Sequence, residues 1–152
     1  MSASIKAVFN KDGVWTVDGR PRETVKLLVT EQPPSIPGKT YISTLLTLPA
    51  GGAMPPHVHG NAAIMGLMLR GALLIQFNDE EPKVYRPGEA WYEGPGMHHV
   101  RSENVGEKGK DEEEVAVYAV IVVDNEVLEK EGFDGLMLLD ADQDEKKGGK
   151  KE

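Results

Sequence analysis

The chain has 152 residues and a formal net charge of −8, with 17 glycines, 10 prolines and no cysteine. The length predicts one domain that buries a sizeable core. The negative charge argues against a nucleic-acid backbone or an anionic membrane surface as a partner. The absence of cysteine excludes disulfides, a thiol nucleophile and cysteine-ligated metal sites. Because the N-terminal segment lacks the apolar run of a signal peptide and no stretch approaches membrane-spanning length, we expect a cytoplasmic protein.

Short apolar and β-branched segments, separated by Gly, Pro, Asn and Asp, predict a series of strands. In chain order these segments are 24–30, 41–48, 72–77, 83–86 and 115–123. Their spacing and the many turn-forming residues between them are typical of an all-β sandwich or barrel. One short helix is expected after the last strand, over 125–133, with an asparagine cap. The charged segment 141–152 has no apolar anchor, so its composition predicts disorder.

All four histidines fall in two short segments that glycines flank. Side chains alternate along a strand, so His57 and His59 project from the same side of an extended segment. Two neighbouring imidazoles suit two positions around Zn, Fe, Ni, Cu, Co or Mn. His98 and His99 are adjacent and face opposite sides, so at most one of them is expected to join the first pair.

The glycines and histidines of the two segments have a fixed spacing. The first segment, Gly51–Gly71, contains His57 and His59. The second, Gly88–Asn104, contains a Gly-Pro-Gly turn and His99, and the 16 residues 72–87 separate the two. In these two motifs the chain resembles the cupin superfamily, and in particular its small single-domain, RmlC-like members.

The resemblance to cupins implies an all-β fold, a single antiparallel jelly-roll barrel (double-stranded β-helix), over residues 1–140. It also implies metal ligands at His57, His59 and His99, while His98 is displaced by one position from the motif. Cupins commonly dimerise, so the resemblance implies a homodimer.

One position departs from the cupin pattern. Where cupins usually carry a glutamate ligand, this chain has Ile64, with Met65 beside it, and neither side chain ligates a hard or borderline metal. Three interpretations follow. The site is a three-histidine centre with open positions, another ligand replaces the glutamate, with Glu93 the nearest candidate, or the metal binds weakly or not at all.

An apolar pocket is expected around the histidines, because several apolar residues of the two motifs share a phase or flank them. The expected pocket residues are Ile64, Gly66, Met68 and Met97, although the methionines also suit an ordinary barrel core. Glu93 is the candidate general base. Arg101 is two residues from His99, so alternation places both side chains on the same face of the strand. Arg101 is therefore the second candidate catalytic residue and would pair with a carboxylate or phenolate of the substrate. The alternative is an arginine exposed to solvent.

The resemblance and the open histidine site together imply a metal-dependent small-molecule enzyme. The expected cofactor is a divalent transition metal, Fe(II) first, with Zn, Ni, Mn or Cu as alternatives. With Fe(II) the protein would be a dioxygenase acting on an apolar, oxygenated substrate that is phenolic, enol or diketone-like. The alternatives are a non-oxidative isomerase, cyclase, lyase or decarboxylase, and a ligand-binding cupin without catalysis.

Overall fold

The computed structural model describes residues 8–106 and 114–149. Its strands, in chain order, are β1 (Val8–Lys11), β2 (Val14–Val17), β3 (Thr24–Glu31), β4 (Lys39–Leu48), β5 (Ala53–Met54), β6 (His57–Val58), β7 (Ala63–Arg70), β8 (Leu73–Phe77), β9 (Lys83–Tyr85), β10 (Ala90–Glu93), β11 (His98–Asn104), β12 (Val115–Asp124) and β13 (Leu138–Leu139). The helices are α1 (Asn125–Glu131), the 3-10 helix η1 (Gly132–Leu136) and α2 (Asp140–Gly149).

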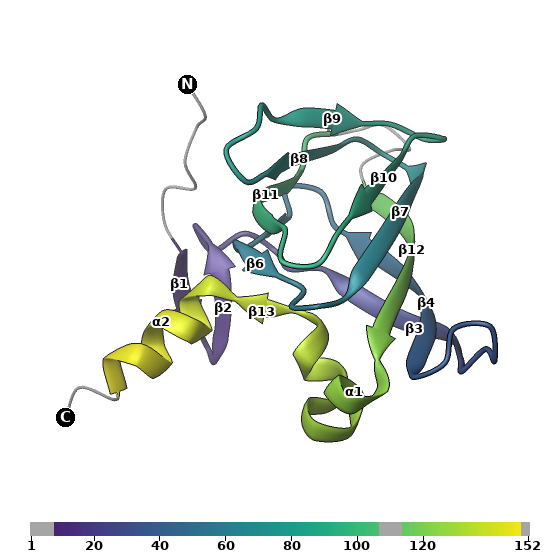
Figure 1. The fold of residues 1–152 in the computed structure, drawn as a ribbon. Helices are drawn as coiled ribbons and strands as arrows, with labels where there is room; N and C mark the ends of the chain where they lie inside the picture. The colour runs from purple at the N-terminus through teal and green to yellow at the C-terminus, as the bar shows by residue number, and fades with distance from the viewer. Residues whose placement is uncertain (1–7, 107–113, 150–152) are drawn as a thin grey trace.

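Two antiparallel sheets form the barrel (Figure 1). The first has the strand order β10-β7-β12-β4-β3, and the second has the order β13-β6-β11-β8-β9, with β5 also pairing with β11. The hairpin of β1 and β2 forms a separate two-stranded sheet. This architecture confirms the predicted all-β, antiparallel jelly roll.

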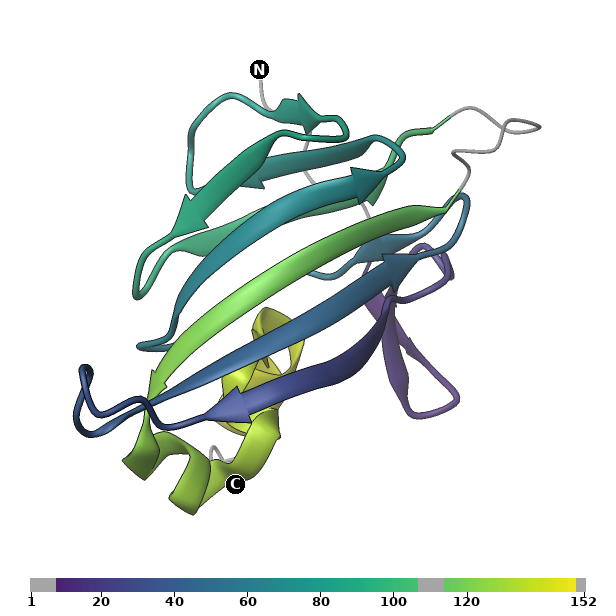
Figure 2. The same cartoon turned by 90° about the vertical axis from the view of Figure 1, so that its right-hand side faces the viewer.

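Strand β12 is central to the first sheet, and its sequence explains why. It pairs with β4 along ten residues, from Val115 opposite Leu48 to Asp124 opposite Lys39, and with β7 on its other side. A strand with neighbours on both sides and a buried inner face favours β-branched residues, which make up six of the ten residues of β12. Its other face belongs to the outer surface of the sheet, which is turned to the viewer in Figure 2.

The core divides into two apolar clusters inside the barrel. One cluster gathers fully buried side chains around Leu48, Met68 and Ile75. The other gathers around Ile42, Ile64 and Ile121. Each fully buried side chain of this size contributes about 1.5–3 kcal/mol through the hydrophobic effect. The histidine motifs lie on strands that these two clusters hold in place.

Helix α1 begins at Asn125, as the sequence predicts, but its N-cap differs from the prediction. The cap residue is Asp124, whose side chain makes no cap hydrogen bond. Asn125 instead accepts a hydrogen bond of 2.6 Å from the Thr40 hydroxyl with its Oδ1. The polar side chain thus connects the helix to β4 rather than capping it.

In place of the predicted disorder from residue 141, the structure has helix α2 up to Gly149. Polar contacts hold this helix where an apolar anchor is lacking. The Asp140 amide donates to the Pro56 carbonyl at 3.0 Å, and Trp15 Nε1 donates to Asp142 Oδ1 at 2.9 Å. Composition missed these contacts because their partners are distant in sequence. Residues 150–152 lie outside the described part of the chain.

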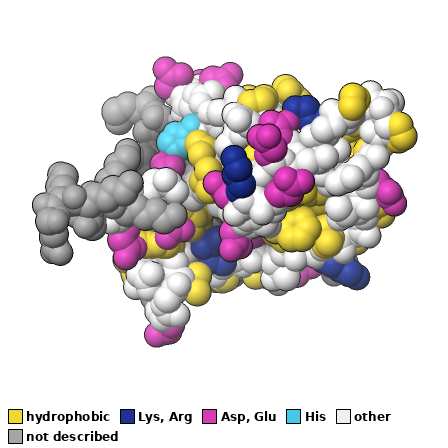
Figure 3. All heavy atoms as spheres, turned by 60° about the horizontal axis from the view of Figure 1, so that its bottom comes forward, with side chains coloured by type: hydrophobic (Ala, Val, Ile, Leu, Met, Phe, Trp, Pro, Cys, Tyr) yellow, Lys and Arg dark blue, Asp and Glu magenta, His cyan; other side chains and the backbone are white. Residues whose placement is uncertain are grey.

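Acidic side chains are scattered over the face shown in Figure 3 rather than gathered in one patch. Of the helices in the described ranges, none combines the length and the apolar character needed to cross a bilayer.

Candidate metal centre

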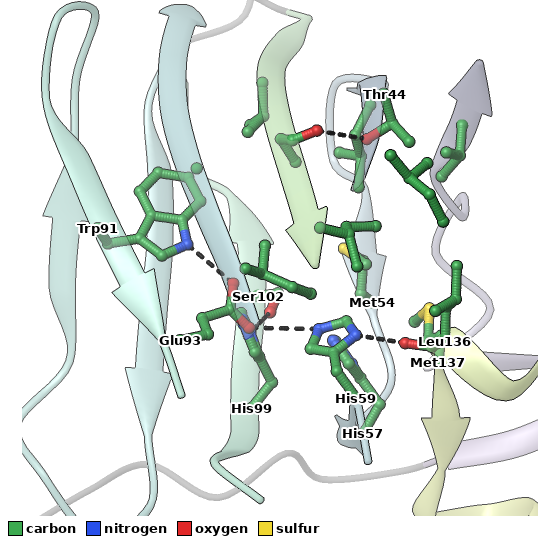
Figure 4. A pocket seen from close by; sticks show the side chains of 18 of the residues that line it. Thr44, Met54, His57, His59, Trp91, Glu93, His99, Ser102, Leu136 and Met137 are labelled. Atoms are coloured by element: carbon green, nitrogen blue, oxygen red, sulfur yellow. Dashed lines mark hydrogen bonds and ion pairs between the residues drawn. The ribbon is translucent and has the colours of Figure 1, made fainter. Parts of the chain in front are cut away.

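The three predicted histidine ligands come together between the two sheets. His57 in β6 stands directly opposite His99 in β11, and His59 follows β6 immediately. Figure 4 shows their imidazoles pointing into one pocket. The ring centroids of His57 and His99 are 4.6 Å apart and those of His59 and His99 5.6 Å. One ligand atom from each of the three lies within 4.8 Å of the others.

Hydrogen bonds on the Nδ1 side orient each ring. His57 Nδ1 donates to the Pro55 carbonyl at 2.8 Å, and His59 Nδ1 donates to the Leu136 carbonyl at 2.6 Å. His99 Nδ1 lies 2.8 Å from the Ser102 hydroxyl. Outer contacts of this kind fix the tautomer and orientation of metal-binding histidines. They leave Nε2 as the nitrogen available to a metal.

The environment of His57 favours the neutral form that binds metals. This side chain is almost fully buried. Burial, together with the neighbouring imidazoles of His99 and His59, lowers the pKa of His57 well below the usual histidine value. A neutral imidazole offers its lone pair without first losing a proton.

Glu93 at the end of β10 is the acidic member of the site. Its Oε1 lies 2.5 Å from His99 Nε2 and 3.2 Å from His59 Nε2. Burial alone would raise the pKa of Glu93, but hydrogen bonds with His59 and His99 outweigh this effect and lower it below the ordinary range. The group is therefore a carboxylate at neutral pH, and in the metal-free protein His99 donates to it.

The other oxygen of this carboxylate is held by Trp91, two residues earlier on β10. Trp91 Nε1 donates to Glu93 Oε2 at 2.9 Å, as Figure 4 shows. The indole lies over Gly66, its partner across the sheet. A Cβ atom at Gly66 would stand 2.4 Å from the indole ring, so only glycine leaves room for Trp91 in this position.

Next to the histidines is a cavity of about 390 Å³ with mostly apolar walls. Its aliphatic walls come from both sheets and include Ile42, Leu46, Ile64, Leu73, Ile75 and Val117. The exposed lining residues Val25, Leu27 and Phe133 mark its mouth, between β3 and η1. No lysine or arginine among the described residues lines it. A cavity of this size and character suits a small ligand with an apolar body.

The predicted pocket residues divide into two pairs. Ile64 and Gly66 line the cavity. Met68 shares their phase along β7, but it packs in the core around Leu48 and does not reach the cavity. Met97 also lies outside the lining, where its sulfur accepts a hydrogen bond from the Gly94 amide. Both methionines were predicted at the pocket, and the structure corrects these two positions.

Arg101 is not at the site, and a β-bulge explains the difference. The prediction assumed that Arg101 and His99 share a face of β11, but the pairing with β8 shifts by one residue between them. The shift breaks the alternation of side chains. Arg101 Nε accordingly donates to Glu103 Oε2 at 2.5 Å, away from the cavity. The same bulge brings Ser102 into the cavity wall beside His99.

Several residues that line the site were not among the predicted site residues, and three of them are informative. Trp91 had a usable signal, because it lies two residues from Glu93 and so shares its face of β10. Ser102 had none, since the bulge reverses its orientation. Met137, which lines the cavity from the segment after η1, could not be found from local sequence because only the tertiary fold brings that segment to the histidines.

His98 lies outside the histidine cluster, as the motif implies. Its Nε2 is 2.7 Å from Asp140 Oδ2 at the start of α2. The side chains inside the barrel that could bind a metal are thus His57, His59 and His99, and the Glu93 carboxylate lies beside them. Imidazole nitrogens with a carboxylate oxygen suit a divalent transition metal, so the residues present fit the metal that a cupin site implies.

Comparisons with known proteins agree with this fold. Residues 44–110 match the model of the cupin domain family. Similar solved structures include an RmlC-like cupin from Methanocaldococcus jannaschii, 19% identical with a TM-score of 0.52, covering 82% of this chain and 95% of that one. The DMSP lyase DddQ from Ruegeria pomeroyi is 19% identical with a TM-score of 0.54, covering 69% of this chain and 49% of that one.

An oxalate oxidase in complex with the substrate analogue glycolate is 22% identical with a TM-score of 0.51, covering 82% of this chain and 63% of that one. No curated protein matches the chain. At these identities the solved structures establish the fold, and the family match covers both histidine motifs. Residues 44–110 therefore match a cupin domain model, and the chain has the double-stranded β-helix fold that the resemblance of its two histidine motifs implies.

Proposed function

We propose that the protein is a metal-dependent enzyme that acts on a small, largely apolar molecule with an oxygen-bearing head group. The observation that carries this proposal is the position of the three imidazoles at the wall of a 390 Å³ cavity that is otherwise almost entirely apolar. A purely structural site would be closed by protein on all sides, whereas this one faces space for a ligand.

His57, His59 and His99 would hold the metal, and the metal would supply a Lewis acid for an enol, phenol or diketone oxygen or, as Fe(II), a centre for dioxygen chemistry. The chain's own residues do the rest. The aliphatic walls exclude water and bind the apolar body of the substrate. Because no cationic side chain in the described residues lines the cavity, the body of the substrate is expected to be uncharged. Glu93 and Ser102 are the polar groups beside the head-group position.

The decisive experiment starts with the metal content of the purified protein, measured by plasma mass spectrometry. The protein is then loaded anaerobically with Fe(II) and supplied with phenols, enols and β-diketones while oxygen uptake is recorded. Uptake that requires substrate and Fe(II) supports the dioxygenase. Product formation without oxygen, with Fe(II) or with Zn, Ni, Mn or Cu, supports the non-oxidative alternative.

The matched control for this experiment is His57→Ala compared with His98→Ala. Both remove an imidazole, but only His57 lies in the cavity cluster. Turnover lost in the first variant and kept in the second is the expected result. A wild-type protein that retains no metal after loading would contradict the proposal. A protein that binds metal and ligand without turnover would instead be a binding module.

A further inference from the structure

We infer that Glu93 is the fourth protein ligand of the metal, taking the place of the glutamate that cupins usually supply from the first motif. This inference rests on the proposed function and goes beyond it, because it assigns the carboxylate a place on the metal rather than the role of a general base. It also gives the site a different charge and a defined set of supporting residues.

Glu93 lies on β10, the strand that pairs with β7. It stands directly opposite Ile64, the residue at the position of the missing glutamate, in the pairing of β10 with β7. Residues directly opposite each other in an antiparallel pair project from the same face, with Cβ atoms about 4.5–5.5 Å apart. A carboxylate lost from β7 can therefore be replaced from β10 without moving the backbone.

One carboxylate oxygen of Glu93 lies close to the Nε2 atoms of two of the histidines. Glu93 Oε1 lies 2.5 Å from His99 Nε2 and 3.2 Å from His59 Nε2. Two ligands on one ion, each bonded at about 2.0–2.2 Å, lie roughly 3 Å apart when they are adjacent. The contact with His59 already has the separation that a neighbouring ligand needs. The contact with His99 is a hydrogen bond, and it would lengthen by about half an ångström when a metal replaces its proton.

Burial and a hydrogen bond from Trp91 fix the orientation of the Glu93 carboxylate. The side chain is buried, and Trp91 Nε1 donates to Oε2 while Oε1 faces the histidines. One oxygen is thus fixed and the other is directed to the site, as expected for a monodentate ligand with an outer hydrogen bond. Gly66 makes this possible by leaving room for the indole. Trp91 and Gly66 are positioning residues in this scheme.

The assignment has a consequence for the ligand. A divalent metal with three neutral imidazoles and one carboxylate carries a net charge of +1. A site of that charge is matched by a single anionic oxygen, such as an enolate or phenolate, rather than by a dianion. Together with the apolar walls, this points to a substrate class of monoanionic enols and phenols.

The test is the affinity and spectrum of Co(II) in the wild type and in Glu93→Gln, with Glu89→Gln as the matched control. Glu89 is exposed at the start of the same segment and lies outside the cavity lining. Removing a residue that hydrogen-bonds to a metal ligand typically weakens metal binding by ~10–100-fold. Because Glu93 would be a ligand itself, we expect Glu93→Gln to weaken Co(II) binding by at least this factor and to change the visible spectrum of the bound Co(II). Glu89→Gln should leave both unchanged.

An exchange variant tests the cross-strand argument. Glu93→Gln combined with Ile64→Glu returns a carboxylate to the opposite strand, and we expect it to recover most of the lost Co(II) affinity. Failure of wild-type protein to bind Co(II) would overturn both this inference and the proposed function. Tight binding by the wild type with the same affinity and spectrum in Glu93→Gln would overturn the ligand role alone and leave the three-histidine enzyme standing.

Discussion

The indole of Trp91 lies across the backbone of Gly66, so close that a Cβ atom on that glycine would overlap the ring. Two strands of one sheet thereby determine where a buried carboxylate sits, since Trp91 donates to Glu93. A glycine without a catalytic group thus controls the geometry of the site. This relationship explains why Gly66 belongs with the functional residues.

Gly66→Ala is expected to push the indole away from the cavity and break its hydrogen bond to Glu93. Overpacking of this kind costs about 1–3 kcal/mol of the free energy of unfolding, and losing an outer hydrogen bond should weaken metal binding by roughly tenfold. Urea denaturation and Co(II) titration measure the two effects. Gly94→Ala is the control, because its Cβ would make only ordinary contacts, at 3.5 Å or more, with Tyr92.

Single alanine substitutions of His57, His59 and His99 should each reduce metal content. Losing an inner ligand should cost more than the ~10–100-fold that outer partners cost. His98→Ala should retain metal, because His98 contacts Asp140 outside the cluster and an exposed contact of this kind contributes about 0–1 kcal/mol to stability. The reverse result, in which His98→Ala loses its metal and His99→Ala keeps it, would contradict the assignment of His99 as the ligand from the second motif.

The predictable part of the fold followed from local patterns. All five expected strands are present within one or two residues of their predicted bounds, because alternation and turn residues are local signals. His57 and His59 were also predictable, because alternation places them on one side of a strand, and the resemblance of the second motif to cupins implied His99. Helix α2 was missed because its contacts, such as Trp15 with Asp142, join residues at opposite ends of the chain.

The rest of the site depended on features that a sequence does not display. Arg101 was predicted at the site because alternation was assumed, and a bulge after His99 breaks that alternation. Met68 shares the phase of Gly66, but it lies farther along the barrel, where core packing replaces the cavity. Alternation along a strand determines which face of the sheet a side chain lies on. The position of the residue along the barrel determines whether that side chain lines the cavity or packs in the core.

Ala119→Phe should shorten the cavity while leaving the three histidines and Glu93 unsubstituted. Ala119 lines the cavity from β12, and its contact with Thr44 uses only the backbone carbonyl, so the substitution keeps that bond. In the Zn(II)-loaded wild type, each added methylene of a 4-alkylphenol series should increase affinity by roughly fourfold, or ~0.8 kcal/mol. The variant should lose this gain beyond the first methylenes. Because Ala119 stands opposite Gly66 in the pairing of β12 with β7, Zn(II) affinity is measured in parallel to detect any displacement of Trp91. Calorimetry measures both quantities, and an identical chain-length dependence in the two proteins would place the ligand elsewhere.

Glu103→Gln should change how stability depends on pH. Burial of Glu103 acts to raise its pKa, but hydrogen bonds from Arg101 and Arg20 outweigh it, so the pKa is lowered in the folded protein. A carboxyl group with a lowered folded pKa stabilises the protein above its unfolded pKa, about 4.3, and this contribution is lost as the pH falls through the folded pKa.

The wild type should therefore exceed Glu103→Gln by about 1.5–3 kcal/mol in free energy of unfolding at pH 7, the range for hydrogen bonds to a charged group. That difference should shrink steadily as the pH falls below about 4.3. Urea denaturation of the metal-free proteins, in the presence of a chelator, measures this difference in free energy of unfolding. Glu93 contributes equally to the wild type and to the variant under these conditions, so its contribution cancels in the difference. Glu89→Gln, at an exposed position, should follow the wild-type curve. A constant difference from pH 7 down to pH 3 would show that the Arg20 and Arg101 contacts stabilise the fold through packing rather than through the charge of Glu103.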